Sequence, residues 1–149
     1  MAPVKTQSQK YLMVMDSYAN LTQWNIKTFE LIKEYKQVLD RVGATAETKN
    51  SRYFFAIDKT RGILKQWDLE SRVLIKDYGQ AHRGYCDVLH ITSCDQYILS
   101  TGGGGGSGEE FIKIWNIGEQ RLIRTISKLS NSDRNCTALT TSKDLRYLF

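Results

Sequence analysis

The sequence predicts an all-β fold built from four-stranded antiparallel units, the blades of a β-propeller. A motif that runs from a tyrosine to a tryptophan is repeated along the chain, and a last tyrosine starts it again. The tyrosines are separated by 42, 44 and 50 residues, which is the period of one blade. Short alternating segments rich in β-branched and aromatic residues, with frequent turn residues between them, oppose a helical fold. The motif residues are Tyr11, Trp24, Tyr53, Trp67, Tyr97, Trp115 and Tyr147.

The first unit contains three expected strands. Residues 11–15 form a continuous apolar run, and the turn-rich residues 16–20 follow it. Residues 21–26 alternate between the two faces of a strand, and residues 29–35 are again strand-like.

Later units gain a further strand before each tyrosine, because a short polar turn stands there. These turns are residues 48–52, 93–96 and 142–146, where Asn and Asp tolerate the backbone conformations of a hairpin. The second and third units therefore have four expected strands, among them residues 85–92, 97–101 and 111–117. The last unit, from about Cys136, has two.

At these residues the chain resembles the WD-repeat β-propeller family. Trp67-Asp68 is the one literal Trp-Asp pair, and Trp24-Asn25 and Trp115-Asn116 are near forms. The resemblance implies a rigid, non-catalytic platform whose loops bind proteins or peptides. It also implies that the seven motif tyrosines and tryptophans are structural core residues.

The resemblance also implies a buried Asp-His-Ser-Trp hydrogen-bond network in each blade. The aspartate position is occupied by Tyr18, Arg61 and Glu109, and the usual Gly-His pair is represented only by Ala81-His82. We therefore expect this network to be missing from every copy.

About three and a half blades are expected, with units at residues 1–36, 37–79, 80–130 and 131–149. Propellers close with about four to eight blades, so this number leaves the ring incomplete. The expectation is a segment of a longer propeller; completion by another chain is the alternative.

A glycine run, residues 102–108, is interpreted as extra length in a hairpin loop. The interval from tyrosine to tryptophan is 13, 14 and 18 residues, so the third copy carries the insertion. A phosphate-binding loop would need a following helix, whereas a strand and the two carboxylates Glu109 and Glu110 follow here.

His82, Cys86, His90 and Cys94 are spaced by four residues and would share one face of a helix, as zinc ligands. In a strand, residues four apart are separated by roughly 13 Å, which is too far for one tetrahedral ion. A zinc- or thiol-dependent activity therefore remains the less favoured alternative, and we expect no enzyme activity, metal or cofactor.

The expected function is a protein-interaction scaffold that uses its loops. The candidate binding residues are Gly102, Gly105, Ser107, Glu109, Glu110, His82 and Arg83. A net charge of +5 keeps an RNA-binding platform as the alternative, although lysine and arginine form no basic block. Three cysteines without framework spacing and the lack of a signal or membrane-spanning segment predict a cytoplasmic protein.

Overall fold

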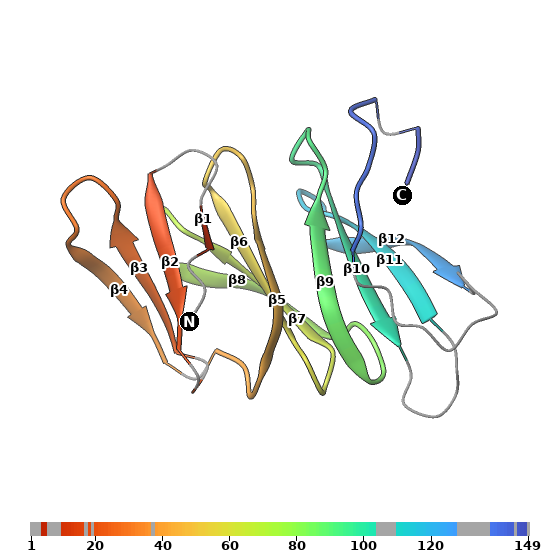
Figure 1. Cartoon of the computed structure of the whole chain (residues 1–149), viewed down its shortest axis with the longest axis horizontal. Coiled ribbons are helices and arrows are strands. Elements are labelled where there is room, and N and C mark those ends of the chain that lie inside the picture. Colours follow the sequence, from red (N-terminus) through yellow and green to blue (C-terminus); the bar gives the residue numbers. More distant parts are fainter. Residues whose placement is uncertain are drawn as a thin grey trace.

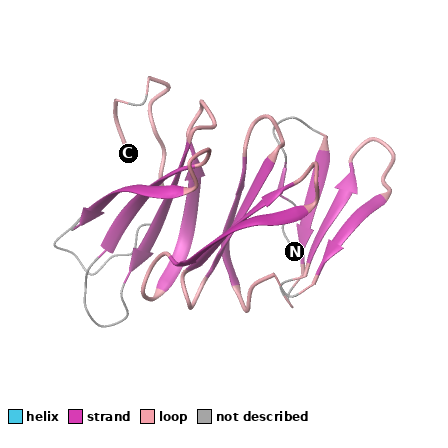
Figure 2. Ribbon diagram, turned by 180° about the vertical axis from the view of Figure 1, so that it is seen from behind, coloured by secondary structure: helices cyan, strands magenta, loops and turns pink. Residues whose placement is uncertain are grey.

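Three four-stranded antiparallel sheets follow one another along the chain (Figures 1 and 2). The computed structural model describes residues 4–5, 10–16, 18, 20–36, 38–103, 110–127, 138–144 and 146–148. This part of the chain contains twelve strands and no helix, as expected for an all-β fold. In each sheet the spatial order of the strands follows the chain order, so every neighbouring pair is joined by a local connection.

The first sheet consists of β1 (Val4–Lys5), β2 (Tyr11–Met15), β3 (Leu21–Asn25) and β4 (Leu31–Tyr35). The second consists of β5 (Val42–Glu47), β6 (Tyr53–Asp58), β7 (Ile63–Asp68) and β8 (Val73–Gln80). The third consists of β9 (Tyr85–Ile91), β10 (Tyr97–Gly103), β11 (Glu110–Asn116) and β12 (Arg121–Ser127).

The prediction of three strands in the first unit is wrong, because β1 pairs with β2 through Val4 with Met13 and Lys5 with Leu12. A strand of two residues is too short to show alternation, so only the turn spacing before Tyr11 could have indicated it.

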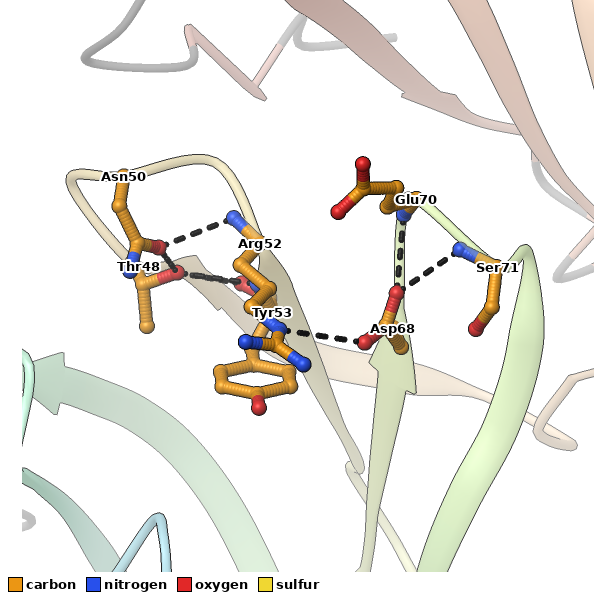
Figure 3. Close-up of polar contacts among 7 residues, drawn as sticks. All are labelled: Thr48, Asn50, Arg52, Tyr53, Asp68, Glu70 and Ser71. Atoms are coloured by element: carbon orange, nitrogen blue, oxygen red, sulfur yellow. Dashed lines mark hydrogen bonds and ion pairs between the residues drawn. The ribbon is translucent and has the colours of Figure 1, made fainter.

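The turns before Tyr53, Tyr97 and Tyr147 share one pattern of hydrogen bonds. Thr48 donates its backbone N–H to the carbonyl of Tyr53, and the N–H of Tyr53 donates to the Thr48 hydroxyl, both at 3.0 Å (Figure 3). Thr92 with Tyr97, and Ser142 with Tyr147, repeat both bonds. A hydroxyl residue five positions before the tyrosine therefore closes the hairpin at each of these places.

The Asp or Asn that follows each tryptophan closes another turn. Asp68 Oδ1 accepts the backbone N–H groups of Glu70 at 3.0 Å and Ser71 at 2.9 Å (Figure 3). Asn25 accepts the N–H groups of Lys27 and Thr28, and Asn116 accepts that of Glu119. The position after each tryptophan thus favours a short side chain with an oxygen acceptor, which explains why either Asp or Asn occupies it.

The sheets pack face to face, and each interface has its own apolar core. We call the face of a sheet that looks toward the next sheet its forward face, and the opposite one its rear face. Met13, Leu21 and Tyr35 on the forward face of the first sheet meet a rear face that includes Trp67. The other rear-face residues in this core are Phe54, Ala56 and Leu69.

The second interface repeats the first. Phe55, Ile57 and Leu64 on the forward face of the second sheet pack against Ile98 and Trp115 of the third. The Trp115 ring meets the Tyr78 ring edge-on, with centroids 5.3 Å apart. A large aromatic side chain buried in this way contributes several kcal/mol, at ~25 cal/mol per Å² of apolar surface.

Close backbone contact joins the second and third sheets at Gly43. A Cβ atom at Gly43 would lie 1.8 Å from the carbonyl oxygen of Cys86. Since that neighbour is backbone, the approach of β5 to β9 requires glycine at this position.

Residues 138–144 and 146–148 lie next to the third sheet as the C-terminal hairpin, with one antiparallel bridge between Thr141 and Leu148. His90 Nε2 lies 3.2 Å from the Thr141 hydroxyl, and the Ser93 hydroxyl donates to the Lys143 carbonyl at 3.4 Å. The hairpin therefore continues the series of sheets on the forward face of the third.

The predicted core residues have different positions. Trp67 and Trp115 are buried, as expected, whereas Trp24 on the rear face of the first sheet is half-buried. Tyr11, Tyr53 and Tyr97 are also half-buried, because they begin their strands beside a turn. The prediction for Tyr147 is wrong, since this side chain is 62% exposed on the C-terminal hairpin.

Replacing Gly43 with alanine is expected to destabilise the protein by about 1–3 kcal/mol, because the new methyl group overlaps the Cys86 carbonyl. Urea unfolding followed by far-UV circular dichroism measures this loss. Gly118→Ala is the matched control, since its Cβ would meet only the Asn116 side chain, at 3.6 Å. Equal stability of the two variants would contradict the close contact.

Glu47 is expected to make the fold less stable as the pH rises. Burial raises the pKa of Glu47 to about 7, against a smaller opposing effect of the Ser51 hydroxyl. A raised pKa in the folded state adds stability that is complete below the ordinary value of 4.5 and is lost as the pH rises through 7. The free energy of unfolding should therefore fall by about 1–2 kcal/mol between pH 4.5 and 8, after allowance for partial exposure. The Glu47→Gln variant should not show this fall. Thermal unfolding over this range, with exposed Glu34→Gln as the control, tests the expectation.

Candidate binding surface

The connections β4–β5, β6–β7 and β8–β9 gather at one end of the sheets, the lower edge in Figure 1. We define the loop surface as residues 40–41, 59–61 and 83–85. The turns of Figure 3 lie at the opposite end of the second sheet.

Asp58 at the end of β6 connects two of these loops. Its Oδ2 accepts the backbone N–H groups of Asp40 and Arg41, both at 3.0 Å. Its Oδ1 accepts those of Thr60 at 2.9 Å and Arg61 at 2.7 Å. Burial alone would raise the pKa of Asp58, but these hydrogen bonds favour the carboxylate and lower the pKa below its ordinary value. The Asp58 carboxylate therefore holds the β4–β5 and β6–β7 loops in place, and its charge is stabilised by the backbone N–H groups of those loops.

The β8–β9 connection is attached to the same turn. The Gly62 carbonyl accepts the N–H of Ala81 at 2.7 Å and that of His82 at 3.3 Å. Gly62 has φ of 63°, and a Cβ there would lie 2.2 Å from the His82 carbonyl oxygen. Only glycine permits both this conformation and this contact.

Exposed side chains of the loop surface are mainly cationic. Arg41 and Arg83 are exposed, and Arg61 forms a surface ion pair with Asp40 at 2.6 Å. Tyr85 adds an aromatic ring that is 54% exposed. Arginine and tyrosine are enriched at protein interfaces, so the composition suits binding of an acidic segment.

A buried hydrogen-bond network of His82, Ser100 and Trp115 lies beneath this surface. The third copy therefore assembles three members of the Asp-His-Ser-Trp set, which the prediction did not foresee, while the aspartate position, Glu109, lies outside the described residues. His82 Nε2 is 2.7 Å from the Ser100 hydroxyl oxygen, which also accepts the indole N–H of Trp115 at 2.9 Å. The donor of the hydrogen bond between His82 Nε2 and the Ser100 hydroxyl depends on the tautomer of the ring. Nδ1 is buried and has no hydrogen-bond partner within the described residues.

Burial lowers the pKa of His82 to about 4, with a further lowering by the Lys113 charge and a smaller opposing effect of Ser100. The Lys113 ammonium donates to the Ala81 carbonyl. His82 is therefore a neutral packing residue near neutral pH. Because Ser100 is fully buried, the Ser100-His82 pair is inaccessible to a substrate.

Gly102 is buried against the His82 ring and does not lie in an exposed loop. Strand β10 extends to Gly103, and a Cβ at Gly102 would lie 2.3 Å from the His82 ring. The prediction of Gly102 and His82 as exposed binding residues is therefore wrong. The Ala81-His82 pair, followed 18 residues later by Ser100, was the available signal, and the missing aspartate concealed it.

The other candidate residues are dispersed. Arg83 lies on the loop surface, as predicted, and Glu110 begins β11. Gly105, Ser107 and Glu109 lie outside the described residues.

Cys86 and His90 lie on β9, whereas His82 and Cys94 lie in the connections before and after it, and the four side chains have separate contacts. Cys86 is buried, with its thiol 3.7 Å from the Gly84 carbonyl, whereas Cys94 is exposed beside Thr92. His90 contacts Thr141. Among the residues that the structure describes, no three such side chains converge as metal ligands.

The described residues contain no helix of the length and apolarity needed to cross a membrane.

Comparison with known proteins gives a likeness in fold. No protein-family model matches the chain, and no curated protein matches it in sequence. The chain is similar in structure to hydrazine synthase from Kuenenia stuttgartiensis, with a TM-score of 0.82 at 13% sequence identity. The match covers 98% of this chain and 41% of that one.

The histidine network predicts a measurable titration. His82 stabilises the fold while neutral: this contribution is present above its ordinary pKa of 6.5 and is lost as the pH falls toward 4. In the His90→Gln variant, the ring proton resonances of His82 should titrate near pH 4 by NMR. A midpoint near 6.5 would contradict the buried network.

Proposed function

We propose that the chain is a WD-repeat-like segment of a β-propeller and serves as a non-catalytic scaffold for protein binding. The carrying observation is the loop surface, where Asp58 and Gly62 fix the backbone while Arg41, Arg83 and Tyr85 stay exposed. A preorganised surface binds with little loss of loop entropy, which favours recognition.

Three stacked sheets joined by local connections support the propeller architecture, as does the structural likeness in fold. The sequence has three cysteines without the spacing of a disulfide framework, which suits a reducing compartment, and we therefore propose a cytoplasmic location.

The partner that suits this surface is a protein segment with carboxylates beside an apolar or aromatic side chain. Arg41 and Arg83 offer forked donors for carboxylates, and Tyr85 offers a flat apolar contact.

RNA is the second candidate, because the cations of the loop surface exceed its carboxylates. Single-stranded RNA binding usually combines cations with several stacking aromatic rings. Tyr85 is the one aromatic side chain within the loop surface as defined above, which favours protein over RNA.

The test is quantitative affinity capture with the full chain and its variants. The double variant Arg83→Ser, Tyr85→Ser should reduce the captured amount of each specific partner at least about tenfold, as expected when hot-spot residues are lost. The matched control is Lys33→Ser combined with Leu31→Ser, which removes a cation and an apolar group exposed on β4.

Unchanged partners in the loop-surface variant would overturn the scaffold assignment for this surface. Salt-dependent binding of a mixed-sequence RNA, lost in the same variant, would establish the RNA alternative.

A further inference from the structure

Phe29, in the turn between β3 and β4, has two features that are unusual together. Its φ of 58° lies in the left-handed region, which is unfavourable for a bulky side chain. Its side chain is 75% exposed, so the fold gains little from burying the ring. Among the described residues, Phe29 is the one apolar side chain at a non-glycine position with positive φ; the other such positions carry Ser51, Arg72, Asp95 and Gln120. Packing among these residues therefore gives no reason for a phenylalanine at this place.

The same turn occurs in the other two sheets with a polar residue at this position. Arg72 and Gln120, with φ of 63° and 52°, also stand four residues after the Asp or Asn that closes the turn. The N–H of Phe29 donates to the Asn25 carbonyl at 2.8 Å, as the N–H of Arg72 donates to the Asp68 carbonyl at 2.8 Å. Arg72 is exposed although its sheet packs between two others. The geometry of the turn therefore exposes this position, whatever lies beside the sheet.

Hydrogen bonds within the turn fix the backbone that carries the ring. Asn25 Oδ1 accepts the N–H groups of Lys27 at 2.9 Å and Thr28 at 3.2 Å. The Asn25 N–H donates to the Glu30 carbonyl at 2.9 Å, and the Thr28 hydroxyl donates to Glu30 Oε2 at 3.0 Å. Phe29 is therefore presented in a conformation that is set before any partner binds, which reduces the entropy lost on binding.

Two ammonium groups accompany the ring. Lys27 is exposed two residues before Phe29, and the exposed Lys10 joins the same turn, because its carbonyl accepts the N–H of Ile26 at 3.4 Å. Within the part of the chain that the structure describes, neither lysine forms an ion pair with a carboxylate. The nearby Glu30 carboxylate already accepts a hydrogen bond within the turn. An apolar ring beside two such cations is complementary to an apolar pocket that has carboxylates on its rim.

We propose that Phe29 is an anchor for a partner protein: its ring enters an apolar pocket of that protein, and Lys10 and Lys27 face carboxylates on the rim of the pocket. A buried aromatic side chain at the centre of a small contact is the usual form of a binding hot spot. A lipid surface suits the turn less well, because one ring and two cations supply little apolar area and little charge for membrane binding. The β3–β4 turn lies at the end of the sheets opposite to the loop surface (Figure 1), so the two contacts are separate.

Replacement by glycine separates a binding role of Phe29 from a structural one. Glycine adopts a positive φ without strain, so Phe29→Gly should leave the urea midpoint of unfolding unchanged or raise it. Arg72→Gly, at the same place in the second sheet, is the matched control and should behave alike. A lower midpoint for Phe29→Gly would show that the ring stabilises the fold, and would overturn the proposal.

Photo-crosslinking from the anchor position identifies the partner. The full chain carries benzoylphenylalanine in place of Phe29, and a control carries it in place of Arg72; both are irradiated in a lysate of the source cells. One protein should be crosslinked from position 29 and not from position 72, through a segment that contains apolar side chains and carboxylates. The purified partner should then bind the chain in fluorescence anisotropy, at least about tenfold more weakly with Phe29→Gly. The double variant Lys10→Glu, Lys27→Glu should also weaken binding, whereas Arg72→Gly should not.

Three further outcomes would overturn the proposal. The first is the lack of a crosslink specific to position 29, or binding that Phe29→Gly leaves unchanged. The second is flotation of the chain, but not of Phe29→Gly, with vesicles of phosphatidylcholine and phosphatidylserine, because the ring would then enter a membrane. The third is light scattering that shows the chain dimeric and Phe29→Gly monomeric, because a second copy would then bind the ring. The Arg83→Ser, Tyr85→Ser variant should bind the crosslinked partner unchanged, which distinguishes this contact from the loop surface.

Discussion

Face-to-face packing of neighbouring sheets is the contact on which the rest of this structure depends. A four-stranded sheet of short strands buries little apolar surface by itself, and each one here gains its core from the next. Trp67 and Trp115 contribute the largest side chains of these two cores. The stacking also sets the backbone positions at Gly43 and Gly62, where contact is so close that a Cβ atom has no room.

This packing fixes the loops that we propose as a binding surface. Asp58 and Gly62 join loops of the second sheet to one another and to the third sheet, so that the surface forms only when the two sheets are stacked. The His82 network stabilises the same junction from below, through a neutral ring whose hydrogen bonds lie inside the interface. The conformation of the loops and the stability of the interface are therefore physically coupled.

The repeated positions have different roles at the two ends of the array. Between sheets they are covered, whereas the rear face of the first sheet leaves Trp24 half-buried and the forward face of the third leaves a cavity. The same side-chain pattern is thus fully buried only where a sheet lies between two others. Position in the stack, and not residue type, distinguishes these roles.

The sequence by itself determined most of the strands and the turns between them, with β1 as the exception, because these depend on local interactions. Alternation placed Leu21 and Trp24 on opposite faces, and the Asn and Asp residues of the short polar turns before Tyr53, Tyr97 and Tyr147 predicted hairpins. Only the tertiary structure decided which residues meet across the sheets. One hydrogen-bond network joins His82, Ser100 and Trp115, although they are far apart in the chain. Gly102 packs against the His82 ring, because a larger side chain there would overlap the ring. Such contacts depend on register and stacking, which no local pattern encodes; for that reason the network was missed while the fold class was predicted.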